Sequence, residues 1–382
     1  MAKKRKADSL YMQIQSYLLD GIQAGRWKAN EALPSENELS SQFGVSRITI
    51  KKAMDLLVEE GIVYRIQGKG SFVSADGKPV LYEQQNRTNA AKPIIALVMP
   101  RVNNQYTGNL LMGIEAAVQA AGAKLLFGTA NDDPEKESQL ISEALEWGAS
   151  GIIIYPSNCE NYNEEILRLT LSGFPIVVID RYIRGVETNC VLSDHEGGAY
   201  EAVSYLLDSG HRNIAYASAV IPGTTSLEDR KNGYLRAMGG TPSARIYELT
   251  TTDTEEAEET IRSFLADRPD ITAFFASHYS IGTRILRAFE GTGVQVPEDL
   301  SVVFFDDFEN SELSRVPPTC VIQQEEEIGK KAAELVISMC RGKGSSRTRI
   351  VLPTKLVVRA STGPVPHRSR MHNERLLGIP RQ

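Results

Sequence analysis

Cysteine and histidine are scarce in this sequence, with four and five residues respectively among 382. The cysteines form no CxxC pair, and no histidine stands near them at a spacing typical of metal ligands. They are Cys159, Cys190, Cys320 and Cys340. We therefore expect no metal site, no cofactor, and reduced, buried thiols of the kind found in cytoplasmic proteins.

Long apolar runs are also missing. No apolar stretch approaches the roughly 18 residues that a membrane-spanning helix needs. The first residues, MAKKRKADSLYMQIQSYLL, mix polar and apolar side chains throughout and so lack the continuous apolar region of a signal peptide. The sequence predicts a cytoplasmic protein with no membrane partner.

Common enzyme motifs are absent as well. The chain has no G-x-G-x-x-G after a strand, no G-x-x-x-x-G-K-[ST] and no G-x-S-x-G. Asp306 and Asp307 could form a carboxylate pair, but adjacent residues on one turn seldom converge on one bond. We expect no catalytic residue.

The chain is long enough for two or three domains, and its 42% apolar and 24% charged residues are typical of a globular protein. Its net charge of -6 is distributed unevenly. Residues 1–80 carry 12 Lys and Arg against 9 Asp and Glu, whereas the remainder is acidic. A basic front on an acidic body favours a polyanionic partner for the front alone. A solvated basic tail is the simpler alternative, because KKRK at 3–6 supplies much of the excess.

Three helices are expected in the front part. DSLYMQIQSYLLDGIQAGRW has apolar residues at helical spacing, and LPSENELSSQFG begins with a capping box formed by Ser35 and Glu38. The third helix runs from Ser46 to Glu60, after a turn at Gly44. Its predicted inward stripe is Ile50, Ala53, Met54 and Leu57. The second and third helices form a helix-turn-helix unit, whose second helix enters the major groove of DNA.

Cations accompany the third helix and the segment after it. Arg47 and Lys51 are four residues apart and therefore share one helix face, with Thr49 nearby. IVYRIQGKGSFV then predicts a hairpin whose tip holds Lys69 between two glycines. Such a wing can place its tip beside phosphates or in a minor groove.

The blocks LPSENEL, FGVSRIT and GKGSFV, in this order across residues 10–73, resemble the winged helix-turn-helix of the GntR family of bacterial repressors. The resemblance implies operator binding by the positions that match the family's DNA contacts, which are Glu36, Arg47, Thr49, Lys51 and Gln67. The helix start and the wing tip add Ser46, Gly68 and Lys69. Ordinary surface residues remain the alternative for Thr49 and Gln67. One departure is Asn37, where many family members have arginine.

After a polar linker at 74–92, strand-like and helical segments alternate from residue 93 onward. Runs such as IIALVM, GIII, PIVVI, AFFA and SVVFF are separated by helical patterns. This alternation predicts two doubly wound α/β lobes, in which ligands bind at the carboxyl ends of the strands. The fold class is therefore multi-domain, with an α+β winged helix-turn-helix followed by a two-lobed α/β body.

Polar and aromatic side chains follow these strands. They include Tyr106, Tyr155, Asp180, Arg181, His278, Tyr279 and Asp306. Aromatic rings cover the C–H faces of a sugar, and charged planar groups bind its hydroxyls. The pattern therefore favours a sugar pocket.

The blocks VIDRYI, GGAYEAVSYLLDSGHRNIAY, RKNGYLRAM, VPEDLSVVFFDD and LVVRAST resemble the ligand-binding core of LacI-type repressors and periplasmic sugar-binding proteins across 93–362. The resemblance implies three crossings between lobes, near 182, 323 and 351. Lobe 1 would then be 93–181 and 324–350, and lobe 2 would be 182–323 and 351–362. The implied pocket residues are Tyr106, Arg181, Arg230, His278, Asp306 and Gln323. For His278, where the family usually has Asn-Asp, a core or rim histidine is the alternative.

A GntR-type front on a LacI-type body resembles the arabinose repressors of Gram-positive bacteria. The resemblance implies a homodimeric repressor of carbohydrate-utilisation genes, which binds double-stranded operator DNA under the control of a sugar such as arabinose or a related pentose. The alternative is a sugar-processing or other α/β-fold enzyme with an accessory DNA-binding domain, which a promoter-shift assay with and without sugar would distinguish from a regulator. The last residues, 363–382, lie beyond both resemblances and are expected to be a disordered tail.

Overall fold

The computed structural model describes residues 14–15, 17–22, 24–59, 61–66, 70–74, 92–157, 163–219, 223–240, 245–251, 256–342 and 347–365. The chain divides into two compact units. The front unit is residues 1–92 with 164–175, and the body is residues 93–163 with 176–382. Each unit is described by itself. The predicted linker at 74–92 lies almost entirely outside the described residues.

The front unit contains the predicted helices and hairpin. Residues 17–22 are helical, and they are followed by α2 (Glu36–Phe43), α3 (Arg47–Glu59), β1 (Val63–Ile66) and β2 (Gly70–Val73). The two strands pair antiparallel. The predicted stripe of α3 is fully buried, in one cluster with Leu18 and Leu39. Helix α6 (Glu164–Leu171) is grouped with this unit. The winged helix-turn-helix expected from the sequence is therefore present.

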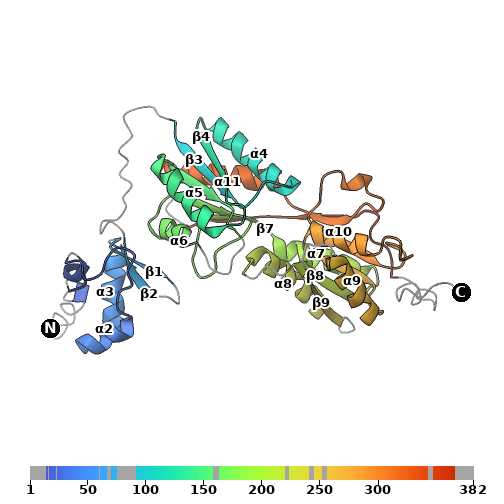
Figure 1. The fold of residues 1–382 in the computed structure, drawn as a ribbon, viewed down its shortest axis with the longest axis horizontal. Helices are drawn as coiled ribbons and strands as arrows, with labels where there is room; N and C mark the ends of the chain where they lie inside the picture. Colours follow the sequence, from blue (N-terminus) through green and yellow to red (C-terminus); the bar gives the residue numbers. More distant parts are fainter. Residues whose placement is uncertain are drawn as a thin grey trace. The chain divides into compact units, whose positions relative to one another are not determined.

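The body has two six-stranded sheets, each with helices packed against it (Figure 1). The sheet of lobe 1 contains β3 (Ile94–Met99), β4 (Lys124–Thr129), β5 (Gly151–Ile154), β6 (Ile176–Ile179), β7 (Cys190–Ser193) and β13 (Arg349–Leu352). The sheet of lobe 2 contains β8 (Asn213–Ala219), β9 (Arg245–Thr251), β10 (Ala273–Ala276), β11 (Ser301–Phe305), β12 (Thr319–Ile322) and β14 (Lys355–Val357). The helices are α4 (Gln105–Ala120), α5 (Pro134–Glu146), α7 (His195–Asp208), α8 (Thr225–Gly239), α9 (Glu256–Asp267), α10 (Tyr279–Ala288), the 3₁₀ turn η1 (Ser311–Leu313) and α11 (Glu325–Cys340).

The two lobes repeat one strand order. Lobe 1 runs β4-β3-β5-β6-β7-β13, and lobe 2 runs β9-β8-β10-β11-β12-β14. All neighbouring strands are parallel except β12 and β14. Strand β6 of lobe 1 therefore corresponds to β11 of lobe 2, and the residues that follow them occupy equivalent places. The doubly wound, two-lobed body predicted from the alternation of strands and helices is confirmed.

The first crossing between lobes differs from the expected position near 182. Strand β7 pairs with β6 and β13 in lobe 1, so the chain crosses only at Asp194, between β7 and α7. Strand β7 follows β6 without an intervening helix, and the alternating pattern therefore does not reveal it. The other crossings fall between β12 and α11 and between β13 and β14, close to the expected positions near 323 and 351.

Glycines allow two pairs of helices to pack closely against each other, α4 with α11 and α8 with α7. A Cβ atom at Gly113 of α4 would lie 2.0 Å from the backbone oxygen of Glu326 in α11. A Cβ atom at Gly233 of α8 would lie 2.2 Å from the backbone oxygen of Glu196 in α7. Since protein interiors tolerate no such overlap, each pair needs glycine at its crossing point. Helices α4 and α8 both present residues to the site described below.

Residues 363–365, which were expected to belong to a disordered tail, are ordered on lobe 2. The Gly363 N–H donates to Ser301 Oγ at 3.1 Å, and the Val365 N–H donates to the Ser209 carbonyl at 3.1 Å. These bonds hold residues 363–365 on lobe 2, and residues 366–382 lie outside the described part. None of the helices in the described ranges has the length and apolar character required to cross a membrane.

Candidate DNA-binding surface and ligand pocket

The start of α3 exposes two cations. Gly44 adopts a left-handed conformation with φ of 63°, and the Ser46 side chain caps α3 by accepting from the Thr49 N–H at 3.3 Å. Arg47 and Lys51 lie exposed, one turn apart on this helix. Within the described residues, no ion pair engages either of them. Their positive charges are therefore available to a polyanion.

Three of the other predicted DNA contacts have partners within the front unit. Ser46 Oγ lies 2.9 Å from Thr49 Oγ1, so these two side chains bond to one another. Glu36 accepts from Arg65 of β1 at 3.2 Å, and Arg65 also pairs with Asp55. Glu36 therefore ties the start of α2 to the hairpin. The predicted contacts Gln67, Gly68 and Lys69 lie outside the described residues.

In the body, a cavity of about 340 Å³ opens between the carboxyl ends of the two sheets. Its volume lies within the range of small-molecule sites, roughly 300–1,000 Å³. All six pocket residues predicted from the sequence line it: Tyr106, Arg181, Arg230, His278, Asp306 and Gln323. The fold thus brings together side chains that are up to about two hundred residues apart in the chain.

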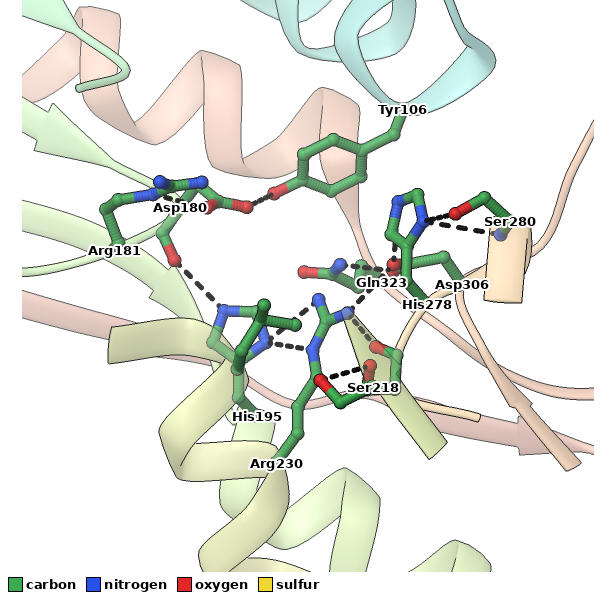
Figure 2. A network of polar contacts seen from close by, with 12 residues as sticks. Tyr106, Asp180, Arg181, His195, Ser218, Arg230, His278, Ser280, Asp306 and Gln323 are labelled. Atoms are coloured by element: carbon green, nitrogen blue, oxygen red, sulfur yellow. Dashed lines mark hydrogen bonds and ion pairs between the residues drawn. The ribbon is translucent and has the colours of Figure 1, made fainter. Parts of the chain in front are cut away.

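Asp180 organises the lobe 1 wall (Figure 2). Its carboxylate accepts from the Tyr106 hydroxyl at 2.6 Å and from Arg181 Nε at 3.1 Å. Arg181 Nη2 donates to the Tyr155 hydroxyl at 3.2 Å, and the guanidinium lies over the Tyr155 ring. Burial alone would raise the pKa of Asp180, but Arg181, His195 and Tyr106 outweigh it and hold that pKa below the usual value. Asp180 is therefore a buried, ionised carboxylate.

Asp306 has the equivalent role in lobe 2. Arg230 Nη1 donates to Asp306 Oδ2 at 3.0 Å and to the Ser277 carbonyl at 2.6 Å. Gln323 Nε2 donates to Asp306 Oδ1 at 2.5 Å (Figure 2). Asp180 and Asp306 follow equivalent strands, and both adopt left-handed backbone, with φ of 70° and 71°. Such conformations cost free energy in non-glycine residues and cluster at binding sites, so each aspartate is held in place by its surroundings.

The ionic groups of the cavity are matched in pairs. Besides Asp180–Arg181 and Asp306–Arg230, the rim carries Arg101 with its Nε 2.6 Å from Asp132 Oδ2. The lining therefore has equal numbers of arginines and aspartates. In the part of the chain that the structure describes, His, Cys, Asp and Glu residues form no group of three or more suited to a metal ion.

One buried acceptor of the pocket is unused. Gln323 is 6% exposed, and its Oε1 atom has no hydrogen-bond partner among the described residues. Its amide cannot be turned around, because Asp306 accepts and so requires the NH₂ group. Leaving such an acceptor unpaired costs about 1–3 kcal/mol, which a hydroxyl donor from a ligand would offset.

His278 has a structural role in addition to its place in the lining. Its Nδ1 atom accepts from the Ser280 N–H at 3.3 Å and thereby caps α10. Its Nε2 atom lies 3.9 Å from Asp306 Oδ2. The ring thus faces the cavity, and it also fixes the start of α10.

Sequence reasoning missed His195, the first residue of α7. Its Nε2 atom lies 3.0 Å from the Asp180 carbonyl, and its Nδ1 atom lies 3.4 Å from both Nε and Nη2 of Arg230. Burial, followed by Arg230, lowers the pKa of His195 to about 4. The sequence signal was the segment DHEGG, residues 194–198, which follows the unrecognised strand β7.

This lowered pKa predicts a pH dependence of stability. The folded protein binds a proton at His195 only near pH 4, whereas the unfolded chain does so near the ordinary value of 6.5. Neutral His195 therefore makes its full contribution to the free energy of unfolding above pH 6.5, and this contribution is lost as the pH falls toward 4. We expect wild type to lose about 3 kcal/mol more than His195→Gln between pH 7 and 4. Calorimetry of both proteins across this range measures the difference, and parallel pH profiles would contradict it.

Comparisons with known proteins agree with this architecture. Residues 10–73 match the model of bacterial regulatory proteins of the gntR family, and residues 203–362 match that of the periplasmic binding protein-like domain. The chain is 30% identical to the arabinose metabolism transcriptional repressor of Geobacillus stearothermophilus, covering 94% of this chain and 99% of the relative. It is 28% identical to the repressor of the same name from Halalkalibacterium halodurans, over 94% and 96%. The crystal structure of a putative ribose operon repressor from Burkholderia thailandensis has a TM-score of 0.61 at 25% identity, covering 69% of this chain and 98% of that one.

Proposed function

Because the chain belongs to the family of the arabinose metabolism transcriptional repressors and joins a GntR-type front to a periplasmic-binding-protein-like body, we propose that it represses carbohydrate-utilisation genes under the control of a small neutral sugar. L-arabinose is the leading candidate. The observation that carries the proposal is the pocket between the lobes, with its matched charges and its unpaired Gln323 acceptor.

The matched charges favour an uncharged ligand. Each arginine of the lining already has an aspartate partner, at 3.1 Å for Arg181, 3.0 Å for Arg230 and 2.6 Å for Arg101. A sugar phosphate or sugar acid would bring a negative charge beside buried Asp180 and Asp306, with no unmatched arginine to receive it. A polyol brings hydroxyls, which can both donate to Gln323 Oε1 and accept from guanidinium N–H groups.

Control of DNA binding follows from the position of the pocket. A sugar that contacts Asp180 and Arg181 in lobe 1 and Arg230 and Asp306 in lobe 2 stabilises the arrangement in which it touches both walls. A ligand shifts such an equilibrium only by its differential affinity for the two states. We expect the lobe change to alter the spacing of two front units in a homodimer, and hence their fit to a palindromic operator. Sedimentation that shows only monomers on operator DNA would exclude this arrangement.

A thermal-shift panel tests the ligand class. We expect L-arabinose or a related pentose, at about 100 times its Kd, to stabilise the body by about 2.7 kcal/mol. The anionic controls are L-arabinonate and D-arabinose 5-phosphate, which should leave the melting temperature unchanged. Stabilisation by either anion and not by a neutral sugar would overturn the assignment of the pocket.

The alternative that the protein is an enzyme would need Asp306 and Asp307 to act together on one bond. The adjacent carboxylates of Asp306 and Asp307 point to different partners, because Asp307 binds Arg359 Nη2 at 2.7 Å and Ser311 Oγ at 2.5 Å. They therefore form no acid–base dyad across one bond. Incubation of the protein with the sugar that it binds, followed by chromatography of that sugar, tests for turnover directly.

A further inference from the structure

His195 lies behind the side chains that line the pocket and connects its lobe 1 wall to its lobe 2 wall. It is the first residue of lobe 2 after Asp194, where the chain crosses from lobe 1. The ring is 3% exposed and packs beside Phe305. One ring nitrogen faces the Asp180 carbonyl of lobe 1, and the other faces Arg230 of lobe 2. Figure 2 shows the ring between these two groups.

The partners of His195 fix its tautomer. The Asp180 carbonyl can only accept, so Nε2 carries the hydrogen and donates to it at 3.0 Å. In a neutral ring Nδ1 is then an acceptor, which suits the N–H groups of Arg230 at 3.4 Å. The lowered pKa of His195 agrees with this neutral ring. A side chain at this place thus needs one donor toward lobe 1 and one acceptor toward lobe 2.

We propose that His195 is a positioning residue, which joins the Asp180–Arg181 pair of lobe 1 to the Arg230–Asp306 pair of lobe 2 and so couples sugar binding to the arrangement of the lobes. The inference rests on the proposed function, since it concerns the same pocket. Asp180 is held in a left-handed conformation with φ of 70°, so any shift of its backbone moves the carbonyl that His195 binds. Among the described residues, the hydrogen bonds of Arg230 go to His195, Ser277 and Asp306, so the shift reaches Arg230 through His195.

Two substitutions separate this polar link from the packing of the ring. His195→Phe keeps a ring of similar size but provides neither donor nor acceptor. His195→Gln provides both from one planar amide and therefore serves as the conservative variant. The probes are L-arabinose and an operator duplex that wild type selects from a random pool. Titration calorimetry gives the sugar affinity, and operator titrations without sugar and at saturation give the response.

We expect His195→Phe to weaken sugar binding at least about tenfold and to shrink the operator response to within about twofold of no change, even at saturation. His195→Gln should stay within about threefold of wild type in both. Wild-type values in His195→Phe would overturn the proposal. Equal losses in the two variants would also overturn it, because the donor and the acceptor that glutamine restores would then recover nothing. Wild type that neither binds nor responds to a sugar would instead refute the proposed function.

A measurement on wild type keeps the inference testable if His195→Phe does not fold. Selective ¹⁵N labelling of the five histidines, with the His195 signal identified by its loss in His195→Gln, reports which ring nitrogen carries hydrogen. We expect hydrogen on Nε2 near pH 7, with a bare Nδ1 atom. Hydrogen on Nδ1, or on both nitrogens, would remove the acceptor for Arg230 and contradict the link.

Discussion

Arg230→Met is expected to abolish the response to sugar and to destabilise the body by about 3–5 kcal/mol. Arg230 is 3% exposed, binds Asp306 and the Ser277 carbonyl, and lies 3.7 Å from the centre of the Phe305 ring. Methionine fills part of the space but leaves Asp306 as a buried carboxylate without its cation. Calorimetric melting and sugar titration together measure the two effects.

Two controls separate stability from ligand recognition. Arg236→Met removes an exposed arginine from the same helix, one that pairs with Glu196, and should cost at most about 1 kcal/mol. The double variant Arg230→Met with Asp306→Leu removes both charges and should regain most of the lost melting temperature without regaining sugar binding. Sugar affinity near the wild-type value in Arg230→Met would place the ligand elsewhere.

Arg47→Ala is expected to weaken operator binding by about 1–3 kcal/mol, or roughly 5–150-fold, with little change in melting temperature. Arg47 is the first residue of α3, exposed and without an ion-pair partner among the described residues. Its loss should also relax discrimination between operator and altered duplexes. Filter binding or fluorescence anisotropy against the selected duplex gives both quantities.

Lys28→Ala is the matched control for Arg47→Ala. Lys28 is exposed in the same unit, near the base of the hairpin where the Asn30 N–H donates to the Val73 carbonyl. Its removal takes away the same charge at the end of the hairpin where Val63 pairs with Val73. An equal loss of affinity in both variants would show that Arg47 contributes only general charge and does not read bases.

Local patterns in the sequence predict much of this structure. The stripe of α3 is buried as its spacing requires, and the capping box of Ser35 and Glu38 is present at the start of α2. Polar residues that follow parallel strands converge at one edge, which is why Tyr106, Arg181, His278 and Asp306 line one cavity. Periodicity and strand order are general rules, and they suffice for these features. Arg230 and Gln323 were predicted only from the resemblance to LacI-type repressors.

Features that depend on pairing between distant segments escape this reasoning. Strand β7 has only four residues, and its place in lobe 1 depends on β6 and β13, so the first crossing and His195 were missed. Glu36, which stays a predicted DNA contact, also pairs with Arg65, a partner 29 positions away that no local pattern indicates. Asp307 likewise pairs with a distant residue, Arg359, which lies 52 positions away in the chain. No local pattern specifies which of several cations a carboxylate meets after folding.

Control of operator affinity by a sugar bound between the lobes is tested most directly by one titration. Full-length wild type is titrated onto its selected duplex without sugar and with L-arabinose at a concentration shown by calorimetry to saturate the pocket. We expect the operator Kd to change by about 5–150-fold, which corresponds to a coupling of about 1–3 kcal/mol. An unchanged operator Kd with the sugar demonstrably bound would contradict the account.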